Sequence, residues 1–261
     1  MQKQTKRKDQ ILAITLDKGS ISVVELSQML RVSTQTIRRD LDDLCSGNLL
    51  QRRHGVVEST LDTKELINAP YNQRVATNPD YKASIARQVA QEIEDGSTIF
   101  ISIGTTPTMV ADALKYKKNL TVMTNNLNAA MLLSEELSNR IIIPGGELRL
   151  PDRDLLGDDV VSFFDSHRAD YGIFGVAGVT AEGTLLDFNA SEVRIREKIT
   201  TNSQTSILVV DSTKFGRVAP AAGGVISAMD RIYMDRHLTK GFESLFESLG
   251  DRLILVGDGN R

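Results

Sequence analysis

The segment from Ser33 to Arg53 constrains this chain more than any other part of its sequence. Ile37, Leu41 and Leu44 recur at positions i, i+4 and i+7, so they share one face of a helix. Ser33 precedes this stretch and is a good N-cap, because its hydroxyl can accept a hydrogen bond from a free amide of the first turn. The sequence therefore predicts a short helix with one aliphatic face and one polar, basic face.

The polar face of this helix suits a DNA major groove. Its Gln, Thr and Arg side chains match the hydrogen-bonding groups of base edges and phosphates. A shorter helix precedes it, with capping-box spacing at Ser22 and Glu25 and an apolar stripe of Leu26, Met29 and Leu30. Two short helices joined this closely form a helix-turn-helix.

Two further elements are expected around the helix-turn-helix. An earlier helix is predicted from about Thr5 to Asp17, and residues 49–57 read as a two-stranded wing with a basic turn. Basic side chains at a wing tip approach the DNA backbone. The predicted DNA contacts are Ser33, Thr34, Gln35, Thr36, Arg38, Arg39, Arg52, Arg53 and His54.

The charge of the chain is divided between its two parts. Of 31 Lys and Arg and 34 Asp and Glu, residues 1–60 hold ten basic and seven acidic, a net charge of +3. The remainder carries a net charge of −6. A basic end on an acidic body is typical of a small DNA-binding module joined to a domain that does not touch DNA.

Composition excludes several other classes of protein. No run of about 18 apolar residues is present, so no membrane span is expected. The single cysteine, Cys45, cannot form an internal disulfide and is expected to be a packing residue, which favours the cytoplasm. His54, His167 and His237 are scattered and no dinucleotide fingerprint is present, so neither a metal nor a cofactor is expected.

From Gly96 onward the chain alternates apolar strands with helices. This alternation predicts an α/β domain with a largely parallel sheet covered on both faces. Another helix, with Ile85, Val89 and Ile93 on one face, is predicted from Pro79 to Glu94. The predicted strands are Thr98–Ile103, Leu120–Thr124, Arg140–Pro144, Tyr171–Ala177, Thr205–Asp211, Arg231–Met234 and Leu253–Val256. The predicted domains are a winged helix-turn-helix at residues 1–57, a linker at 58–78 and a sensor domain at 79–261.

Polar turns follow several of these strands, where ligands bind in parallel sheets. Gly104, Thr105 and Thr106 open a helix whose Pro107 suits the first turn, so free amides and the helix dipole predict an anion site. Lys214 can add a positive charge, whereas Asp187 and Glu192 can accept hydroxyl groups, and Arg194 to Lys198 is expected to be a solvated helix face. The candidate ligand-binding residues are Ser102, Gly104, Thr105, Thr106, Asn125, Asn126, Gly145, Gly146, Arg149, Asp187, Glu192 and Lys214.

At these motifs the chain resembles one protein family along most of its length. The segment Ser33–Leu41 and the basic wing resemble the amino-terminal domain of the DeoR family of bacterial repressors. The turns at Gly104–Thr106, Asn125–Asn126, Gly145–Arg149 and Asp211–Gly216 resemble, in order, those of its carboxy-terminal sensor domain. One departure is Ser102, which stands where the family's pattern has an aspartate.

The resemblance implies both a fold and a function. The sensor domain of the family is related in fold to sugar-phosphate isomerases such as ribose-5-phosphate isomerase. Its members repress carbohydrate or polyol operons and leave double-stranded operator DNA when a phosphorylated sugar or polyol, such as glycerol 3-phosphate, binds. The chain is therefore expected to be such a repressor and, since a lone helix-turn-helix contacts little DNA, a homodimer or higher even oligomer.

The alternative is an isomerase that acts on a sugar phosphate and carries an appended DNA-binding module. Such an enzyme needs a base and an electrophile, roles that Asp187, Glu192 and Lys214 can nominally fill. The DNA-binding module would have no purpose in that enzyme, so the sequence favours the repressor. Saturable binding of a sugar phosphate without turnover discriminates the repressor from the enzyme.

Overall fold

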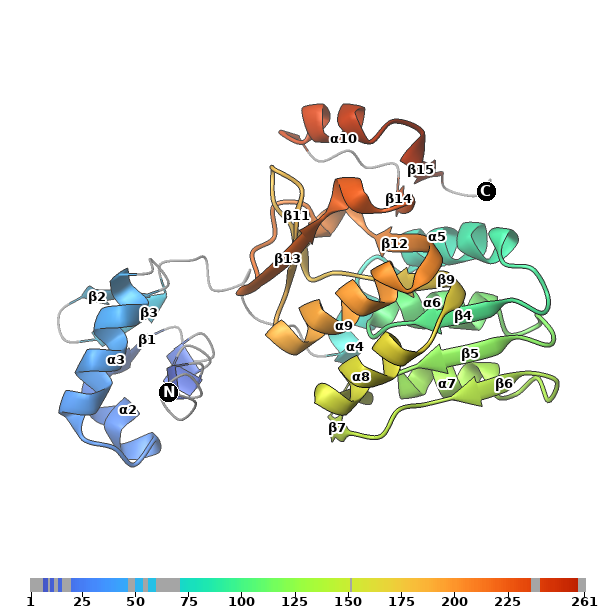
Figure 1. Ribbon diagram of the computed structural model, residues 1–261. Coiled ribbons are helices and arrows are strands. Elements are labelled where there is room, and N and C mark those ends of the chain that lie inside the picture. The colour runs from blue at the N-terminus through green and yellow to red at the C-terminus, as the bar shows by residue number, and fades with distance from the viewer. Residues whose placement is uncertain are drawn as a thin grey trace. The chain divides into compact units, whose positions relative to one another are not determined.

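The computed structural model (Figure 1) divides into two compact units, Met1–Ile67 and Asn68–Arg261. The division falls inside the segment 58–78 that the sequence predicts to be a linker. The structure describes residues 7–8, 10–11, 14–15, 20–46, 50–53, 56–59, 71–150, 152–235 and 240–257.

The first unit contains the predicted helix-turn-helix. The predicted capping box is confirmed: the amide of Glu25 donates to Ser22 Oγ, and the Glu25 carboxylate accepts from the amide of Ser22. Ser33 is confirmed as an N-cap, because the amide of Thr36 donates to its hydroxyl over 3.2 Å. The two helices are α2 (Val23–Met29) and α3 (Thr34–Ser46).

A three-stranded antiparallel sheet completes this unit. The predicted wing strands are β2 (Leu50–Arg53) and β3 (Val56–Ser59), and a strand that the sequence analysis missed, β1 (Ser20–Ser22), pairs with β3. The predicted wing turn at His54 and most of the predicted first helix lie outside the described residues. The apolar core that joins these elements is made of Ile11, Ile21, Leu26, Ile37, Leu41, Leu44, Leu50 and Val57.

The second unit is built on a seven-stranded sheet in which every pair of neighbouring strands is parallel. All seven predicted strands are present, with ends that differ by a few residues. They are β4 (Thr98–Ile101), β5 (Thr121–Thr124), β6 (Arg140–Ile142), β9 (Ala169–Phe174), β12 (Ser203–Val210), β14 (Arg231–Asp235) and β15 (Leu253–Val256).

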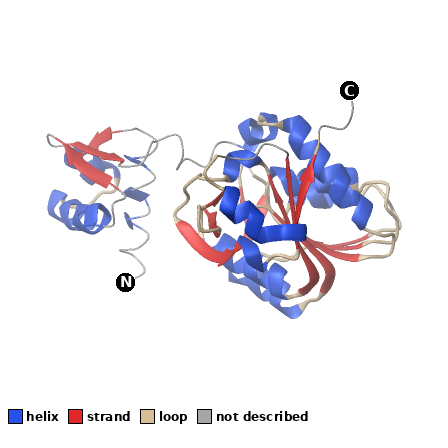
Figure 2. Cartoon of the chain, turned by 90° about the horizontal axis from the view of Figure 1, so that it is seen from above, coloured by secondary structure: helices blue, strands red, loops and turns tan. Residues whose placement is uncertain are grey.

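Helices cover both faces of this sheet (Figure 1 and Figure 2). In strand β4 the side chains alternate, so Ile99 and Ile101 enter one core and Phe100 enters the other. Helices α5 (Pro79–Glu92), α6 (Thr105–Ala113) and α7 (Leu127–Leu133) contribute to the first core. Helices α8 (Asp158–Ser166), α9 (Ala190–Thr201) and α10 (Glu243–Leu249) contribute to the second. Helix α4 (Tyr71–Ala76) precedes them and packs against α6.

The order of the strands determines where a ligand can enter. The sheet runs β15-β14-β12-β9-β4-β5-β6, so the chain moves outward in one direction from β4 and in the other from β9. The junction of β4 and β9 is therefore a topological switch point, beyond whose carboxyl ends ligands bind in such sheets.

Two small sheets lie beside this carboxyl edge, and the sequence analysis did not predict them. One is a hairpin of β7 (Glu147–Arg149) and β8 (Asp154–Leu156). The other joins β10 (Gly178–Val179), β11 (Thr184–Asp187) and β13 (Ala221–Val225). Among the described residues, no helix is both long and apolar enough to cross a membrane.

Candidate functional site

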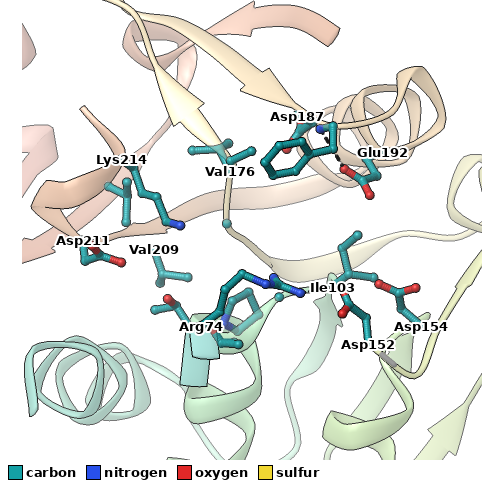
Figure 3. Close-up of a pocket in the computed structure, with 18 of the residues that line it drawn as sticks. Arg74, Ile103, Asp152, Asp154, Val176, Asp187, Glu192, Val209, Asp211 and Lys214 are labelled. Atoms are coloured by element: carbon teal, nitrogen blue, oxygen red, sulfur yellow. Dashed lines mark hydrogen bonds and ion pairs between the residues drawn. The ribbon is translucent and has the colours of Figure 1, made fainter. Parts of the chain in front are cut away.

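A pocket that is partly open to solvent lies at the switch point of the parallel sheet (Figure 3). Residues that follow strands β4, β9 and β12 line it, together with the hairpin β7–β8 and the start of helix α9. Seven of the predicted ligand-binding residues meet there: Gly104, Thr105, Thr106, Arg149, Asp187, Glu192 and Lys214.

One side of the pocket is the start of helix α6. Gly104 is the N-cap residue and has a φ of 117°, which favours glycine, and no described side chain caps the helix. Pro107 lacks an amide hydrogen, and the first-turn amides of Thr105 and Thr106 precede any intrahelical acceptor. Together with the helix dipole, these amides can bind an anion.

Lys214 supplies a positive charge beside this helix start. It ends a short 3-10 turn, Ser212–Lys214, directly after strand β12, and Figure 3 shows its side chain directed into the pocket. Burial, and next the charge of Arg217, lowers the pKa of Lys214 to about 8. Asp211 lies nearby and is buried, and its Oδ2 has no hydrogen-bond partner among the described residues. Lys214 therefore places a positive charge beside the start of helix α6.

The opposite side of the pocket is acidic and is organised by Arg149. This side chain donates two hydrogen bonds to Asp154, of 2.9 and 2.6 Å, and one of 2.5 Å to Oε1 of Glu192. The other carboxylate oxygen of Glu192 accepts from the amide of Phe188 over 3.1 Å. Burial raises the pKa of Asp154. The carboxylates of this side are held at fixed positions from which they can accept hydroxyl hydrogen bonds.

Asp187 forms an ion pair with Arg196. This pair shows that one expectation from the sequence, the one for Arg196, was wrong. Arg196 was predicted to lie on a solvated helix face, but it is 3 % exposed, pairs with Asp187 over 3.0 Å and donates to the carbonyl oxygen of Gly223. Its neighbours Arg194 and Lys198 do face solvent and pair with residues of α8. Burial raises the pKa of Asp187 to about 6.

Five predicted residues do not line the pocket: Ser102, Asn125, Asn126, Gly145 and Gly146. Asn126 caps helix α7 and donates to the carbonyl oxygen of Ser102 over 3.2 Å and to Thr108 Oγ1 over 3.0 Å, which fixes the turn before α6. Asn125 donates to the carbonyl oxygen of Leu155 and so fastens the hairpin β7–β8. These side chains hold the turns that carry the lining residues.

Sequence reasoning also missed residues of the pocket, chiefly Arg74 and Asp152. Arg74 lies on α4 and forms an ion pair with Asp152, which lies between the strands of the hairpin. No sequence signal indicated Arg74, because it follows no strand. The ammonium of Lys82 donates to the carbonyl oxygen of Arg74. The burial of Lys82 could have been predicted, because it lies three residues before Ile85 on the buried stripe of α5.

The helix-turn-helix presents the predicted DNA-binding face. On α3, Gln35, Arg38 and Arg39 are exposed, whereas Ile37 and Leu41 are fully buried. Ser33 is exposed, and Thr34 and Thr36 are half-buried.

The predicted wing residues are only partly described. Arg52 donates to the carbonyl oxygen of Arg38 over 2.8 Å and pairs with Asp42 over 2.9 Å, so it ties the wing to α3. The side chain of Arg53 and all of His54 lie outside the described residues.

Two family models match the chain. One is described as the DeoR C terminal sensor domain and matches residues 77–236; the other is the DeoR-like helix-turn-helix domain and matches residues 7–63. Every residue that lines the pocket except Arg74 lies in the first of these regions, and the exposed face of α3 lies in the second.

Curated relatives cover nearly the whole chain. The glycerol-3-phosphate regulon repressor of Escherichia coli strain K12 is 44 % identical over 233 residues, 89 % of this chain and 91 % of that protein. The repressor of the same name in Haemophilus influenzae is 38 % identical, covering 88 % of this chain and 89 % of that protein. The HTH-type transcriptional repressor CsqR of E. coli is 33 % identical, covering 88 % and 87 %. The turns at Ile103–Pro107, Asn125–Asn128, Gly145–Arg149 and Lys214–Arg217 resemble those of a glycerol-3-phosphate regulon repressor, and the 44 % identity agrees with that resemblance.

Solved structures show a weaker similarity. Ribose 5-phosphate isomerase A of Methanocaldococcus jannaschii has a TM-score of 0.39 and 16 % identity, with coverage of 54 % of this chain and 56 % of that chain. The eIF2B delta protein of Chaetomium thermophilum has a TM-score of 0.43 and 15 % identity, with coverage of 62 % and 56 %. The two family models and the full-length relatives, by contrast, agree with each other and with the motifs, and the chain belongs to the DeoR family.

Proposed function

We propose that this protein represses a polyol or carbohydrate catabolic operon and leaves its operator when glycerol 3-phosphate, or a closely similar phosphorylated polyol, binds the pocket. The names of its full-length relatives support this proposal. The observation that carries it is the uneven distribution of charge in the pocket. The start of helix α6 and Lys214 lie on one side, and the carboxylates that Arg149 holds lie on the other.

This distribution of charge matches a small molecule with a phosphate at one end and hydroxyl groups at the other. The amides of Thr105 and Thr106 and the ammonium of Lys214 would bind the phosphate, because charge-assisted hydrogen bonds to an anion are the strong ones. Glu192, together with Asp187, would accept hydrogen bonds from the hydroxyl groups. Ser102, Asn125, Asn126, Gly145 and Gly146 would act by shaping the turns.

We infer that the pocket senses its ligand and does not convert it. An aldose–ketose isomerase needs a carboxylate free to take a proton from carbon. Here Glu192 accepts from Arg149 and from the amide of Phe188, and Asp187 is paired with Arg196. Both carboxylates are thus held in place as hydrogen-bond acceptors for hydroxyl groups, and the helix-turn-helix model and the names of the relatives support binding without turnover.

DNA reading is assigned to the exposed face of α3. Gln35, Thr36, Arg38 and Arg39 would contact base edges, and Arg52 and Arg53 the backbone. Two such modules bound to a symmetric operator distinguish that operator from other DNA sequences far better than one module does. We therefore propose a homodimer or a higher even oligomer.

Titration calorimetry with glycerol 3-phosphate, glycerol and inorganic phosphate tests the pocket. Glycerol 3-phosphate should bind one site per chain, more tightly than either fragment. Lys214→Met should weaken binding about tenfold or more, since hydrogen bonds to charged groups contribute about 1.5–3 kcal/mol. The matched control is Lys198→Met on α9, whose ammonium pairs with Asp165 at the surface.

Two outcomes would contradict the proposal. One is equal affinity for glycerol and glycerol 3-phosphate, which would show that the phosphate is not recognised. The other is unchanged affinity in Lys214→Met, which would place the site elsewhere. Phosphorus NMR of the same mixtures should show no new product, and a product would favour the isomerase.

A further inference from the structure

Helix α4 reaches the pocket through a single side chain. The guanidinium of Arg74 forms an ion pair with Asp152, and both residues line the pocket. Figure 3 shows Arg74 directed into the same space as Lys214. Asp152 is also 3.7 Å from the guanidinium of Arg149, so it is shared between two arginines. Arg74 therefore lies where an anionic ligand would compete with Asp152 for its charge.

The backbone of Arg74 is tied to the same region by Lys82. This lysine is 2 % exposed, and its ammonium lies 2.5 Å from the carbonyl oxygen of Arg74. Burial lowers the pKa of Lys82, and the nearby carboxylate of Asp211 opposes that effect. The charge of Asp211 likewise opposes the lowering of the pKa of Lys214, so this carboxylate acts on both lysines.

Apolar packing does little to fix the position of α4. The helix has six residues and none of them is buried. A hydrogen bond of 3.4 Å between the hydroxyl groups of Tyr71 and Thr108 links the helix to α6. The position of α4 thus depends on polar contacts that a charged ligand can exchange, rather than on a hydrophobic core that would resist movement.

Helix α4 is also the entry point of the chain into the second unit. It is the first described element after strand β3, and only residues 60–70 separate the two in the described ranges. Of the described elements of the second unit, α4 is therefore the one nearest along the chain to the DNA-binding unit.

We propose that Arg74 is the residue through which ligand occupancy reaches the DNA-binding unit. In the structure its guanidinium pairs with Asp152, and in the complex with an anionic effector it turns to the phosphate and α4 moves with it. This inference rests on the proposed function, since it requires an anionic effector in the pocket. A ligand can shift an equilibrium only by binding one state more tightly, and the exchange of Asp152 for a phosphate supplies that difference.

The test measures coupling, defined as the ratio of operator dissociation constants with and without saturating glycerol 3-phosphate. The full-length protein is used with a duplex selected from a random pool by binding to the wild type, and its affinity is measured by fluorescence anisotropy. The wild type should show a ratio of about tenfold or more, within the usual range of allosteric coupling. In Arg74→Met the ratio should fall to within about twofold of unity, while glycerol 3-phosphate still binds through Lys214 and α6.

Asp152→Asn provides an independent variant that removes the competing charge with little change of shape. It should bind glycerol 3-phosphate about fivefold more tightly and bind the duplex more weakly without ligand, because Arg74 is already released. The matched control is Arg87→Met. Arg87 is an exposed arginine of α5 whose guanidinium donates to Ser84, and the ratio of this variant should equal that of the wild type.

The outcomes separate this inference from the proposed function. If the wild type neither binds glycerol 3-phosphate nor changes its affinity for the duplex, both are overturned. If the wild type responds but Arg74→Met keeps the wild-type ratio, or Asp152→Asn binds the ligand no more tightly, only the role of Arg74 is overturned.

Discussion

Nη1 of Arg149 lies 2.5 Å from Oε1 of Glu192, and this ion pair joins the hairpin β7–β8 to the first turn of helix α9. The same guanidinium holds Asp154 through two further hydrogen bonds. One side chain therefore fixes two carboxylates on the acidic side of the pocket, and its removal would leave both without their strongest partner.

Arg149→Met should lower the free energy of unfolding of the second unit by about 3 kcal/mol, since breaking a buried ion pair leaves uncompensated charge. The matched control is Arg194→Met. The Arg194 side chain is 54 % exposed and pairs with exposed Asp158. That control should cost less than about 1 kcal/mol. Urea unfolding of the full chain, followed by circular dichroism, measures both. Equal losses in the two variants would show that the Arg149 cluster is not a buried network.

The affinity for glycerol 3-phosphate should depend on pH through Lys214. Its pKa is lowered to about 8 by burial and next by Arg217, and Lys82 and Arg74 act in the same direction while Asp211 opposes them. An anionic ligand stabilises the protonated ammonium, so the pKa of Lys214 rises in the complex. Affinity is therefore fully present below the lowered pKa and falls as pH rises through about 8.

Calorimetric titrations between about pH 7 and pH 9.5 check this dependence, a range that lies above the second ionisation of a phosphate ester near pH 6. The loss of affinity at high pH should be absent in Lys214→Met, because that variant has no ammonium to titrate. An identical decline in the variant and the wild type would assign the titration to another group.

Operator binding should distinguish the exposed arginines of α3 from Arg52. Arg38→Ala should weaken specific binding by roughly 1–3 kcal/mol if its guanidinium contacts guanine. Arg52→Ala should weaken binding to all duplexes alike and lower the slope of log affinity against log salt by about one. Fluorescence anisotropy over a range of salt concentrations measures both effects, and Arg87→Ala in the second unit serves as the control. An Arg38→Ala, Arg39→Ala double variant that binds as the wild type does would refute the assignment of this face.

The elements predicted correctly from the sequence are those in which burial leaves a strong periodic signal. Strands such as β4 and β12 are buried on both faces and read as continuous apolar runs, and helix α5 shows Ile85 and Val89 at helical spacing. The hairpin β7–β8 and the sheet of β10, β11 and β13 were missed. Their strands are short, and Gly223 and Gly224 occupy much of β13, so neither alternation nor β propensity marks them.

The residues that line the pocket could be predicted only where they directly follow a strand. That rule found Gly104 and Lys214 but could not find Arg74, which enters the site from a helix ahead of the first strand of the sheet. Arg196 was misjudged because its neighbours are charged, although it lies three residues from both Val193 and Ile199 and so shares their buried face. The partners of such residues are distant in sequence, which is why local patterns do not reveal them.

The most direct test of the account is the affinity of the wild-type protein for its selected duplex as glycerol 3-phosphate is added. The duplex should dissociate with a midpoint that follows the calorimetric affinity for glycerol 3-phosphate. Glycerol and inorganic phosphate at the same concentrations should release little of the duplex. If glycerol 3-phosphate occupies the pocket while the affinity for the duplex stays unchanged, the claim that this pocket controls DNA binding is contradicted.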